Sequence, residues 1–341
     1  MDELHSFPLL ALVGQPELKT ALILALINPG IGGVLVSGPY GVGKTTAVRG
    51  LLDILPLVEH EELDGEGRAK TMRERMRLVE LPLNARIDDV VGGINERVAL
   101  EQSRVLLEEG VLARAHRNLL YVDEINLLEP RVADAILDAA AQGRTLVRRG
   151  AMTRLYPTQF VLIGSMNPQE GELRPQIMDR FGLRVWVAPL SDPQQRLEIY
   201  RRTHAFRSDP AAFRRAYAAQ TADLAEEVEA AREIVPHVTV PPAVEELALA
   251  VVQALQVPSH RAEIALIEGA RARAAADFRN IVSASDIRSV APLALRQRRS
   301  LEIEAYAARS AAENSLIEAT FRQITDGPAP PPSPPSRRKR P

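Results

Sequence analysis

Short apolar runs that end in polar residues recur along the first half of the chain. Val34–Val36 is a β-branched run between glycines, and Leu119–Val122 and Phe160–Ile163 are similar runs, each followed by polar residues. Runs of this length and composition favour buried strands. Helical patterns such as 45–55 separate them. The alternation predicts an α/β fold with a parallel sheet flanked by helices, with ligands at the carboxyl ends of its strands.

Three further segments have distinct patterns. Residues 58–77 are charged and lack a clear apolar period, which favours a mobile loop or an exposed helix. Residues 143–157 alternate around Arg149-Gly150, which predicts a β-hairpin with strands at 145–148 and 152–156. From Pro193 to Ile324 only Ala- and Leu-rich helical patterns remain.

These patterns predict three regions. We expect residues 1–192 to form the α/β domain and residues 193–326 to form a smaller, all-α C-terminal domain. Residues 327–341 contain seven prolines and end in a basic run. Because this segment cannot bury apolar surface, we expect a disordered tail.

Composition narrows the classes of function. The 341 residues are 46% hydrophobic and 25% charged, as in ordinary globular proteins. The chain has no cysteine, which excludes disulfides, thiolate chemistry and Cys-ligated zinc. The N-terminus lacks a basic n-region, and the longest apolar runs are too short to span a bilayer. We therefore expect a cytoplasmic protein without membrane insertion. The net charge of −2, without basic-aromatic interleaving, argues against nucleic acid.

One motif indicates chemistry directly. Residues 38–45 fit the pattern G-x-x-x-x-G-K-[ST]. Its glycines let backbone N–H groups point at phosphate oxygens, its lysine compensates phosphate charge, and its threonine binds Mg²⁺. The alternative, a glycine-rich turn that matches by chance, does not explain the strand before it and the helix after it. The predicted ATP-binding residues are Gly38, Pro39, Tyr40, Gly41, Val42, Gly43, Lys44, Thr45 and Thr46.

Two acidic residues end the strand run 119–122. Asp123 would hold Mg²⁺ together with Thr45, and Glu124 would act as general base on the attacking water. A solvated Asp-Glu pair at a strand end is the simpler alternative. With the phosphate loop upstream, the catalytic interpretation is favoured.

Three other polar residues are weaker candidates from their positions alone. Asn167 follows the 160–163 strand and could orient the water, but Asn-Pro also begins ordinary turns. Arg180 lies near a predicted helix end and could stabilise transition-state charge in a neighbouring subunit. Arg261 begins a helix after Pro258 and could contact the same nucleotide from the helical side. A solvated surface arginine is the alternative for both.

Several blocks together resemble one family, the AAA+ I subunit of magnesium chelatase. The resemblance runs from about residue 12 to 299 and is most specific at residues 121–128 and 173–183. The other matching blocks are residues 28–35, 81–83, 88–96 and 110–115.

The resemblance implies roles that the patterns alone do not give. It implies that Asn167 is sensor 1, Arg180 the arginine finger and Arg261 sensor 2. It also implies a helix-2 insert at 83–105, a hairpin insert at 143–157 and a helical lid from residue 193.

The resemblance also implies assembly and partners. Proteins of this family form hexameric rings with ATP at subunit boundaries. They work with a von Willebrand-type AAA+ subunit and a large porphyrin-binding subunit in magnesium chelatase, a ligase that forms nitrogen–metal bonds. The complex inserts Mg²⁺ into protoporphyrin IX in (bacterio)chlorophyll biosynthesis, for photosynthesis.

A second function stays open from the sequence. The segment 56–81 is shorter and more charged than the family pattern, and the proline-rich basic tail is not part of it. These departures also fit a paralogue, such as a MoxR-type AAA+ chaperone for metal insertion or maturation of another protein. A neighbouring gene for a large porphyrin-binding subunit would separate the two.

Overall fold

The computed structural model describes residues 6–63, 69–94, 101, 106–149, 152–299 and 301–325. The chain forms two compact units, Met1–Arg298 and Arg299–Pro341. Within the described part of the second unit, Leu301–Thr325 forms helix α13. The predicted tail, 327–341, lies outside the described residues. The predicted boundary at 192/193 stays a prediction.

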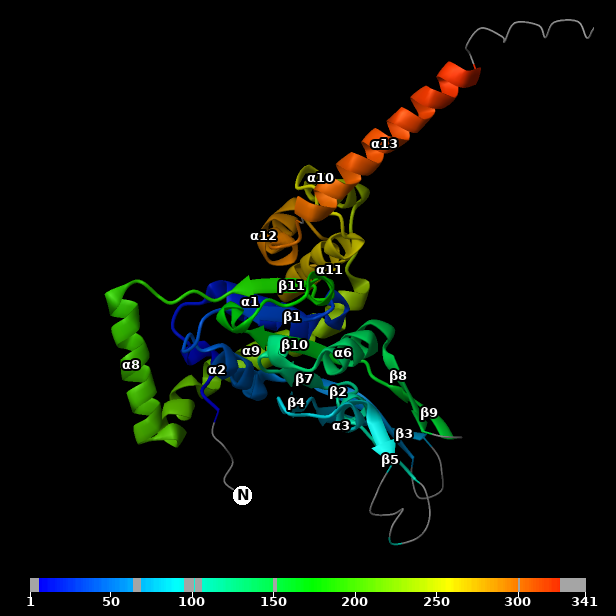
Figure 1. Ribbon diagram of the computed structural model, residues 1–341. Helices are drawn as coiled ribbons and strands as arrows, with labels where there is room; N and C mark the ends of the chain where they lie inside the picture. The colour runs from blue at the N-terminus through cyan, green and yellow to red at the C-terminus, as the bar shows by residue number, and fades with distance from the viewer. Residues whose placement is uncertain are drawn as a thin grey trace, which may run out of the picture. The chain divides into compact units, whose positions relative to one another are not determined.

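A five-stranded parallel sheet organises the first unit, with strand order β11-β1-β10-β7-β4. Figure 1 shows the strands stacked in this order. Two strands lie where the sequence pattern placed them, and the third begins one residue later than predicted. The strands at the two edges were not predicted. The strands are β1 (Val34–Ser37), β4 (Leu78–Leu81), β7 (Leu119–Val122), β10 (Val161–Met166) and β11 (Leu183–Trp186).

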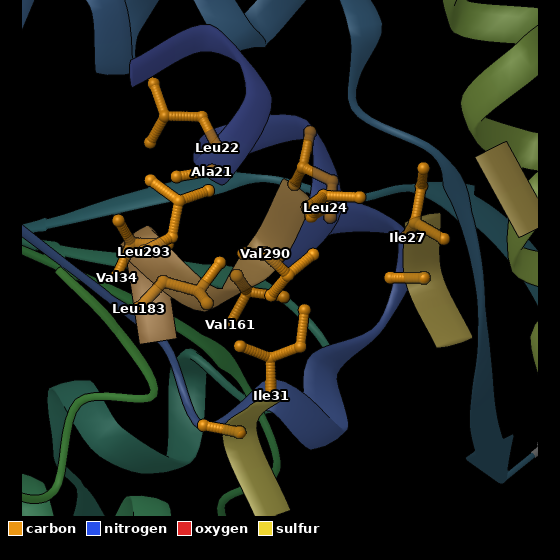
Figure 2. Close-up of a cluster of buried hydrophobic side chains, with 14 of the residues drawn as sticks. Ala21, Leu22, Leu24, Ile27, Ile31, Val34, Val161, Leu183, Val290 and Leu293 are labelled. Carbon is orange, nitrogen blue, oxygen red and sulfur yellow. The ribbon is translucent and has the colours of Figure 1, made fainter. Parts of the chain in front are cut away.

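Helices cover both faces of this sheet, so alternate strand residues enter different cores. Val34 and Val36 pack in the core that includes α1, α9, α11 and α12, whereas Leu35 packs in the core that includes α3 and α6. Figure 2 shows side chains of the first core, among them Val34 of β1 and Val290 and Leu293 of α12. Burial on both faces explains why these strands are continuous apolar runs without alternation.

The helices begin and end at residues that suit their termini. Pro16 and Pro130 occupy the first positions of α1 and α6, and Gly143 ends α6 in the left-handed region at φ 66°. Asp192 and Asp209 accept backbone N–H groups at the starts of α8 and α9. The larger helices are α1 (Pro16–Ile27), α6 (Pro130–Gln142), α8 (Pro193–Ser208), α9 (Pro210–Ile234), α10 (Pro242–Ala254), α11 (His260–Ala276) and α12 (Ala284–Leu295). The shorter ones are α2 (Lys44–Arg49), α3 (Ile87–Val91), α5 (Val111–Arg114) and α7 (Pro175–Met178), with 3₁₀ turns at 9–11, 29–31, 50–54, 125–127, 168–170 and 235–237.

Three two-stranded sheets accompany the main one: β2 (Leu57–Leu63) with β3 (Ala69–Arg75), β5 (Gly92–Ile94) with β6 (Leu107–Glu109), and β8 (Arg144–Arg149) with β9 (Met152–Pro157). The expectation of a loop or exposed helix at 58–77 was wrong, because β2 and β3 pair antiparallel throughout. Glu59 faces Arg73 across this hairpin, and their charged groups lie 3.8 Å apart. Cross-strand charge pairs replace the apolar alternation that marks most strands.

The two predicted inserts are only partly described. The hairpin of β8 and β9 occupies the predicted insert 143–157, apart from residues 150 and 151. In the predicted insert 83–105, residues 95–100 and 102–105 lie outside the described residues. Among the described residues from Pro193 on, all long elements are helices, which confirms the predicted α/β domain followed by a helical region. No helix in the described ranges is long and apolar enough to cross a membrane.

Candidate functional site

Three neighbouring strands bring the predicted site residues to one edge of the sheet. The phosphate loop follows β1, Asp123 follows β7, and Asn167 follows β10. Since β1, β10 and β7 are adjacent and parallel, their carboxyl ends meet. The structure therefore brings together the residues that the sequence placed at separate strand ends.

The phosphate loop has the backbone that its glycines permit. Gly41 and Gly43 adopt positive φ angles of 74° and 87°. A Cβ at Gly38 would lie 2.5 Å from the Val187 carbonyl oxygen, so only glycine fits there. Helix α2 begins at Lys44 directly after the loop. The strand, loop and helix follow in the order that the motif requires.

Lys44 is folded back over this loop. Its ammonium donates to the carbonyl oxygens of Gly38, at 2.6 Å, and Pro39, at 2.9 Å. Burial lowers the pKa of Lys44, although the carboxylates of Asp123 and Glu124 oppose that shift. These contacts keep the ammonium on the inner side of the loop, where a bound phosphate chain would need positive charge.

Asp123 is held by three hydroxyl groups. Tyr121 donates to its Oδ1 at 2.8 Å, and Thr45 donates to its Oδ2 at 3.3 Å. Ser165, which is fully buried, also donates to Oδ1. Tyr121 additionally lies 3.3 Å from the Thr45 hydroxyl, and burial first of all raises the pKa of the phenol. The network fixes the carboxylate beside the threonine hydroxyl.

This arrangement fits a Mg²⁺ ion bound together with a nucleotide. Mg²⁺ commonly uses one or two protein oxygens plus phosphate oxygens and waters. Thr45 and Asp123 offer one hydroxyl and one carboxylate at the end of the phosphate loop. Across the described ranges, no group of three or more His, Cys, Asp or Glu side chains could hold a metal by itself. The donor set suits a metal shared with phosphate and does not suit an all-protein metal cage.

Glu124 has a backbone conformation that is unusual for its residue type. Its φ is +47°, in the left-handed region, and its N–H donates to the Ser165 hydroxyl at 3.1 Å. Such a conformation costs of order 1–3 kcal/mol and clusters at functional sites. Partial burial, followed by the charges of Glu170 and Asp123, raises the pKa of Glu124. These environments favour a carboxylate that can accept a proton.

Asn167 presents a hydrogen-bond donor that has no partner within the described ranges. The residue is 1% exposed, and its Oδ1 accepts the Gln169 N–H at 3.2 Å. That bond fixes the orientation of the amide, because the reverse orientation would place two donors together. Its buried Nδ2 therefore lacks a partner in this region. A donor of this kind beside the phosphate loop suits an oxygen of a ligand or its water.

The two predicted catalytic arginines lie near the amino ends of the strands, opposite the phosphate loop. Arg180 precedes β11, and a Cβ at Gly32, just before β1, would lie 3.7 Å from its carbonyl oxygen. Its side chain pairs with Asp138 of α6 at 2.6 Å. Arg261 lies nearby, because its Nη1 is 3.8 Å from the Asp179 carboxylate. Neither arginine meets the phosphate loop of its own chain.

The position of Arg261 bears on which nucleotide it could contact. From the sequence, Arg261 could contact the same nucleotide as Arg180 from the helical side, and this stays a prediction. A cleft of about 1230 Å³ adjoins the phosphate loop, and its walls come from the N-terminal segment and α8. Among the described residues that line it, none belongs to α10, α11 or α12. The physical reason is that α11 packs beside the amino ends of the strands, near Asp179.

Sequence reasoning missed three residues of the site. Tyr121 and Ser165 each lie two positions before a predicted site residue, on the same strand face. Since strand side chains alternate, this spacing could have identified both. Glu170, whose buried Oε2 has no partner within the described part of the chain, carries no sequence signal.

Comparison with known proteins relates the chain to one family over most of its length. The family described as "Magnesium chelatase, subunit ChlI" matches residues 9–177, and the "AAA lid domain" family matches residues 246–319. The magnesium-chelatase 38 kDa subunit of Acidiphilium rubrum is 42% identical over 312 residues, which cover 86% of this chain and 90% of that protein. A magnesium-chelatase subunit ChlI homolog of Methanocaldococcus jannaschii is 39% identical, with 86% of each protein covered.

Solved structures give two further similarities. A Cytophaga hutchinsonii protein crystallised as a candidate ATPase is 22% identical, with a TM-score of 0.59 over 90% of this chain and 91% of that one, and shares the fold. A chain from a complex of the magnesium chelatase subunits BchI and BchD is 37% identical, with a TM-score of 0.49 over 89% of this chain and 99% of that one. By its identity to curated relatives across 86% of its length, the chain belongs to the magnesium chelatase subunit ChlI family.

Proposed function

We propose that this chain is the ATP-hydrolysing AAA+ motor subunit of a magnesium chelatase that inserts Mg²⁺ into protoporphyrin IX for (bacterio)chlorophyll biosynthesis. One observation carries the ATPase part: Thr45 and Asp123 meet at the end of the phosphate loop, at 3.3 Å. The family membership supports the chelatase part. The combination suits a nucleotide–Mg²⁺ site in a subunit of a larger ligase.

Each site residue has a role that follows from its position. The N–H groups of residues 40–43 would bind phosphate oxygens, and Lys44 would turn from the loop carbonyls toward phosphate charge. Thr45 and Asp123 would hold the ion. The ion, when bound there, would supply positive charge against the negative charge that develops on the phosphates.

Glu124 would take a proton from the attacking water, and the free Nδ2 of Asn167 would orient that water. The raised pKa of Glu124 suits proton acceptance. The cleft beside the loop, with walls from the N-terminal segment and α8, is roomy enough for the base and ribose.

We propose that Arg180 and Arg261 complete the site of a neighbouring subunit. Both lie near the amino ends of the strands, and the phosphate loop lies at the carboxyl ends. The chain from Gly33 to Gly38 makes five residue-to-residue steps of about 3.3 Å, which span about 17 Å when extended. An arginine side chain of six bonds, about 7 Å long at ordinary bond lengths, cannot cross that distance. A hexameric ring with ATP at each boundary satisfies this geometry.

The domain assignments and partners are also proposals. Residues 1–192 would bind ATP, and residues 193–326 would act as the lid, with inserts at 83–105 and 143–157. A von Willebrand-type subunit and a large porphyrin-binding subunit would be the partners. In their favour, a relative named BchI is described in complex with BchD.

A second function has one observation in its favour. The Methanocaldococcus jannaschii relative, 39% identical, carries only the name of a ChlI homolog. A MoxR-type chaperone that matures another protein would use the same ATP site. The two functions differ in the partner and not in the residues above.

Reconstitution tests the proposal. The purified chain should hydrolyse ATP only with Mg²⁺. Mixed with the two other chelatase subunits of a close relative, it should produce Mg-protoporphyrin, detected by its fluorescence. ATP hydrolysis without any metal insertion, in a mixture where the relative's own I subunit succeeds, would favour the chaperone function.

A further inference from the structure

The Arg298 guanidinium donates hydrogen bonds to residues on both sides of Arg180. Its Nε donates to the Ala294 carbonyl at 2.6 Å, and its Nη1 donates to the Asp179 carboxylate at 2.8 Å and to the Asp179 carbonyl at 3.3 Å. Its Nη2 donates to the carbonyls of Phe181, at 2.8 Å, and Gly182, at 3.0 Å. A guanidinium has five N–H donors, and every one has an acceptor here. Four of those acceptors belong to the residues that flank Arg180.

Arg184 makes the reciprocal connection. From β11 it donates to the Met178 carbonyl at 2.7 Å and to the carbonyls of Arg296 and Gln297. Each arginine therefore binds the segment that carries the other. Together they join residues 178–182 to the end of α12.

Both arginine side chains are buried, so their hydrogen bonds depend on the shape of the guanidinium group. The Arg298 side chain is 0% exposed and the Arg184 side chain is 3% exposed. Burial lowers the pKa of both, and the Asp179 charge opposes this for each. A buried charge is tolerated only with well-formed hydrogen bonds, so the loop geometry is fixed by the guanidinium fork. An ammonium with three donors cannot reproduce it.

We propose that Arg298 is a positioning residue for Arg180: it holds the arginine-finger loop against the end of α12, so that the finger is aimed at the neighbouring subunit. The inference rests on the proposed function of Arg180. It predicts that the helical region controls hydrolysis in the neighbour's site through one side chain. Arg298 contacts no residue of the phosphate loop, so ATP binding by its own chain is independent of it.

Substitution of Arg298 by lysine tests this role. Arg298→Lys keeps the charge and should lower kcat about 10- to 100-fold, as expected for a misplaced catalytic group. The Kd for ATP, measured by equilibrium binding to the same protein, should stay within about twofold. Arg232→Lys is the control, because Arg232 is a partly buried arginine that donates to a backbone carbonyl, that of Leu26, outside residues 178–182, and this variant should leave kcat unchanged.

Two further measurements separate positioning from general damage. The double variant Arg298→Lys with Arg180→Ala should be no slower than Arg180→Ala alone, because the finger is already absent. Mixing Arg298→Lys with Lys44→Ala subunits should restore activity, because the first supplies intact phosphate loops and the second supplies a correctly held finger.

The outcomes distinguish this inference from the proposed function. Wild-type activity in Arg180→Ala would refute the finger itself. A dead Arg180→Ala together with wild-type kcat in Arg298→Lys would overturn only the positioning role. Equal losses of ATP binding and kcat in Arg298→Lys would also overturn it. If Arg298→Lys does not fold, Asp179→Asn takes its place, since it keeps an acceptor for Arg298 and removes the charge; an unchanged kcat in that variant would refute the inference.

Discussion

Arg180→Ala should leave ATP binding intact and remove hydrolysis. The predicted finger lies beyond the amino end of β1, whereas the phosphate loop follows the carboxyl end. About 17 Å of strand separates the two edges, so the substitution cannot alter the loop by contact. The loss should therefore appear in kcat and not in the Kd for ATP.

The structure also sets the size of the effect. Removing a finger supplied in trans costs about 10³–10⁵ in rate. Before it can act, the Arg180 side chain must leave Asp138, and these side chains are 30% and 53% exposed. A pair this exposed contributes about 0.2–1 kcal/mol, so releasing it changes the rate by at most about fivefold. Asp138→Asn is accordingly the matched control, with an expected rate between one and five times that of the wild type.

Mixed assemblies give the sharper assay. Arg180→Ala subunits keep their phosphate loops and Lys44→Ala subunits keep their fingers. In an equal, random mixture about a quarter of the boundaries pair an intact loop with an intact finger, because ring contacts are head-to-tail. Steady-state phosphate release at saturating Mg-ATP should recover toward that fraction. A protein with both substitutions, mixed with either single variant, should recover nothing.

Three results would refute this reasoning. An Arg180→Ala rate above a tenth of the wild-type rate would remove Arg180 from the reaction. A wild-type rate per subunit that stays constant on dilution to monomers would exclude a shared site. Absence of recovery in verified mixed rings would exclude action in trans by independent sites.

Four other substitutions test the remaining assignments. Lys44→Ala should abolish ATP binding, whereas Glu124→Gln should bind ATP and fail to hydrolyse it; isothermal titration and phosphate release distinguish them, and normal turnover in Glu124→Gln would exclude it as the base. Tyr121→Phe should raise the Mg²⁺ concentration for half-maximal hydrolysis about fivefold, because it removes one hydrogen bond to Asp123 that contributes about 1 kcal/mol. An unchanged Mg²⁺ dependence would contradict the network around Asp123. Burial works to raise the pKa of Asp286, but hydrogen bonds from Arg279 and from the α12 cap outweigh it and lower the pKa. Its stabilising contribution is thus present above the unfolded-state pKa and is lost as pH falls through the folded one. Asp286→Asn should lower the free energy of unfolding by about 2–3 kcal/mol at pH 7, with the difference closing below about pH 4, as measured by denaturant titration; a pH-independent difference would contradict the ionic contribution.

The central sheet was largely predictable because burial leaves a simple pattern. Leu119–Val122 is β7 itself, and the run at 160–163 lies at β10. The edge strands β4 and β11 were missed. β4 contains Glu80, and its exposed or half-exposed residues weaken the apolar run by which inner strands are found. The hairpin at 57–75 was missed because cross-strand charges, not apolar alternation, form its visible pattern.

The residues of the candidate site likewise include some that the sequence could place and some that it could not. Asp123 and Asn167 follow strands, so the sequence could place them at one edge. Tyr121 was overlooked because it lies inside the apolar run 119–122, and Ser165 was overlooked because the predicted strand ended at Ile163. The position of Arg180 at the opposite edge depends on where the chain enters β11, which no local pattern reports. The contact of Arg298 with residues 179–182 joins positions over 100 apart, which only the folded chain brings together.

The phosphate loop and the finger lie at opposite ends of the strands, and this affects how many complete sites an assembly contains. A linear row of n subunits would contain n − 1 complete sites, with one loop and one finger left unused at its ends. Closing the row adds a whole site without adding a subunit. A ligand that touches both sides of a boundary stabilises closure by its own binding free energy. A nucleotide whose terminal phosphate contacts the neighbour's Arg180 would therefore stabilise the contact between the two subunits. Its hydrolysis would weaken that contact.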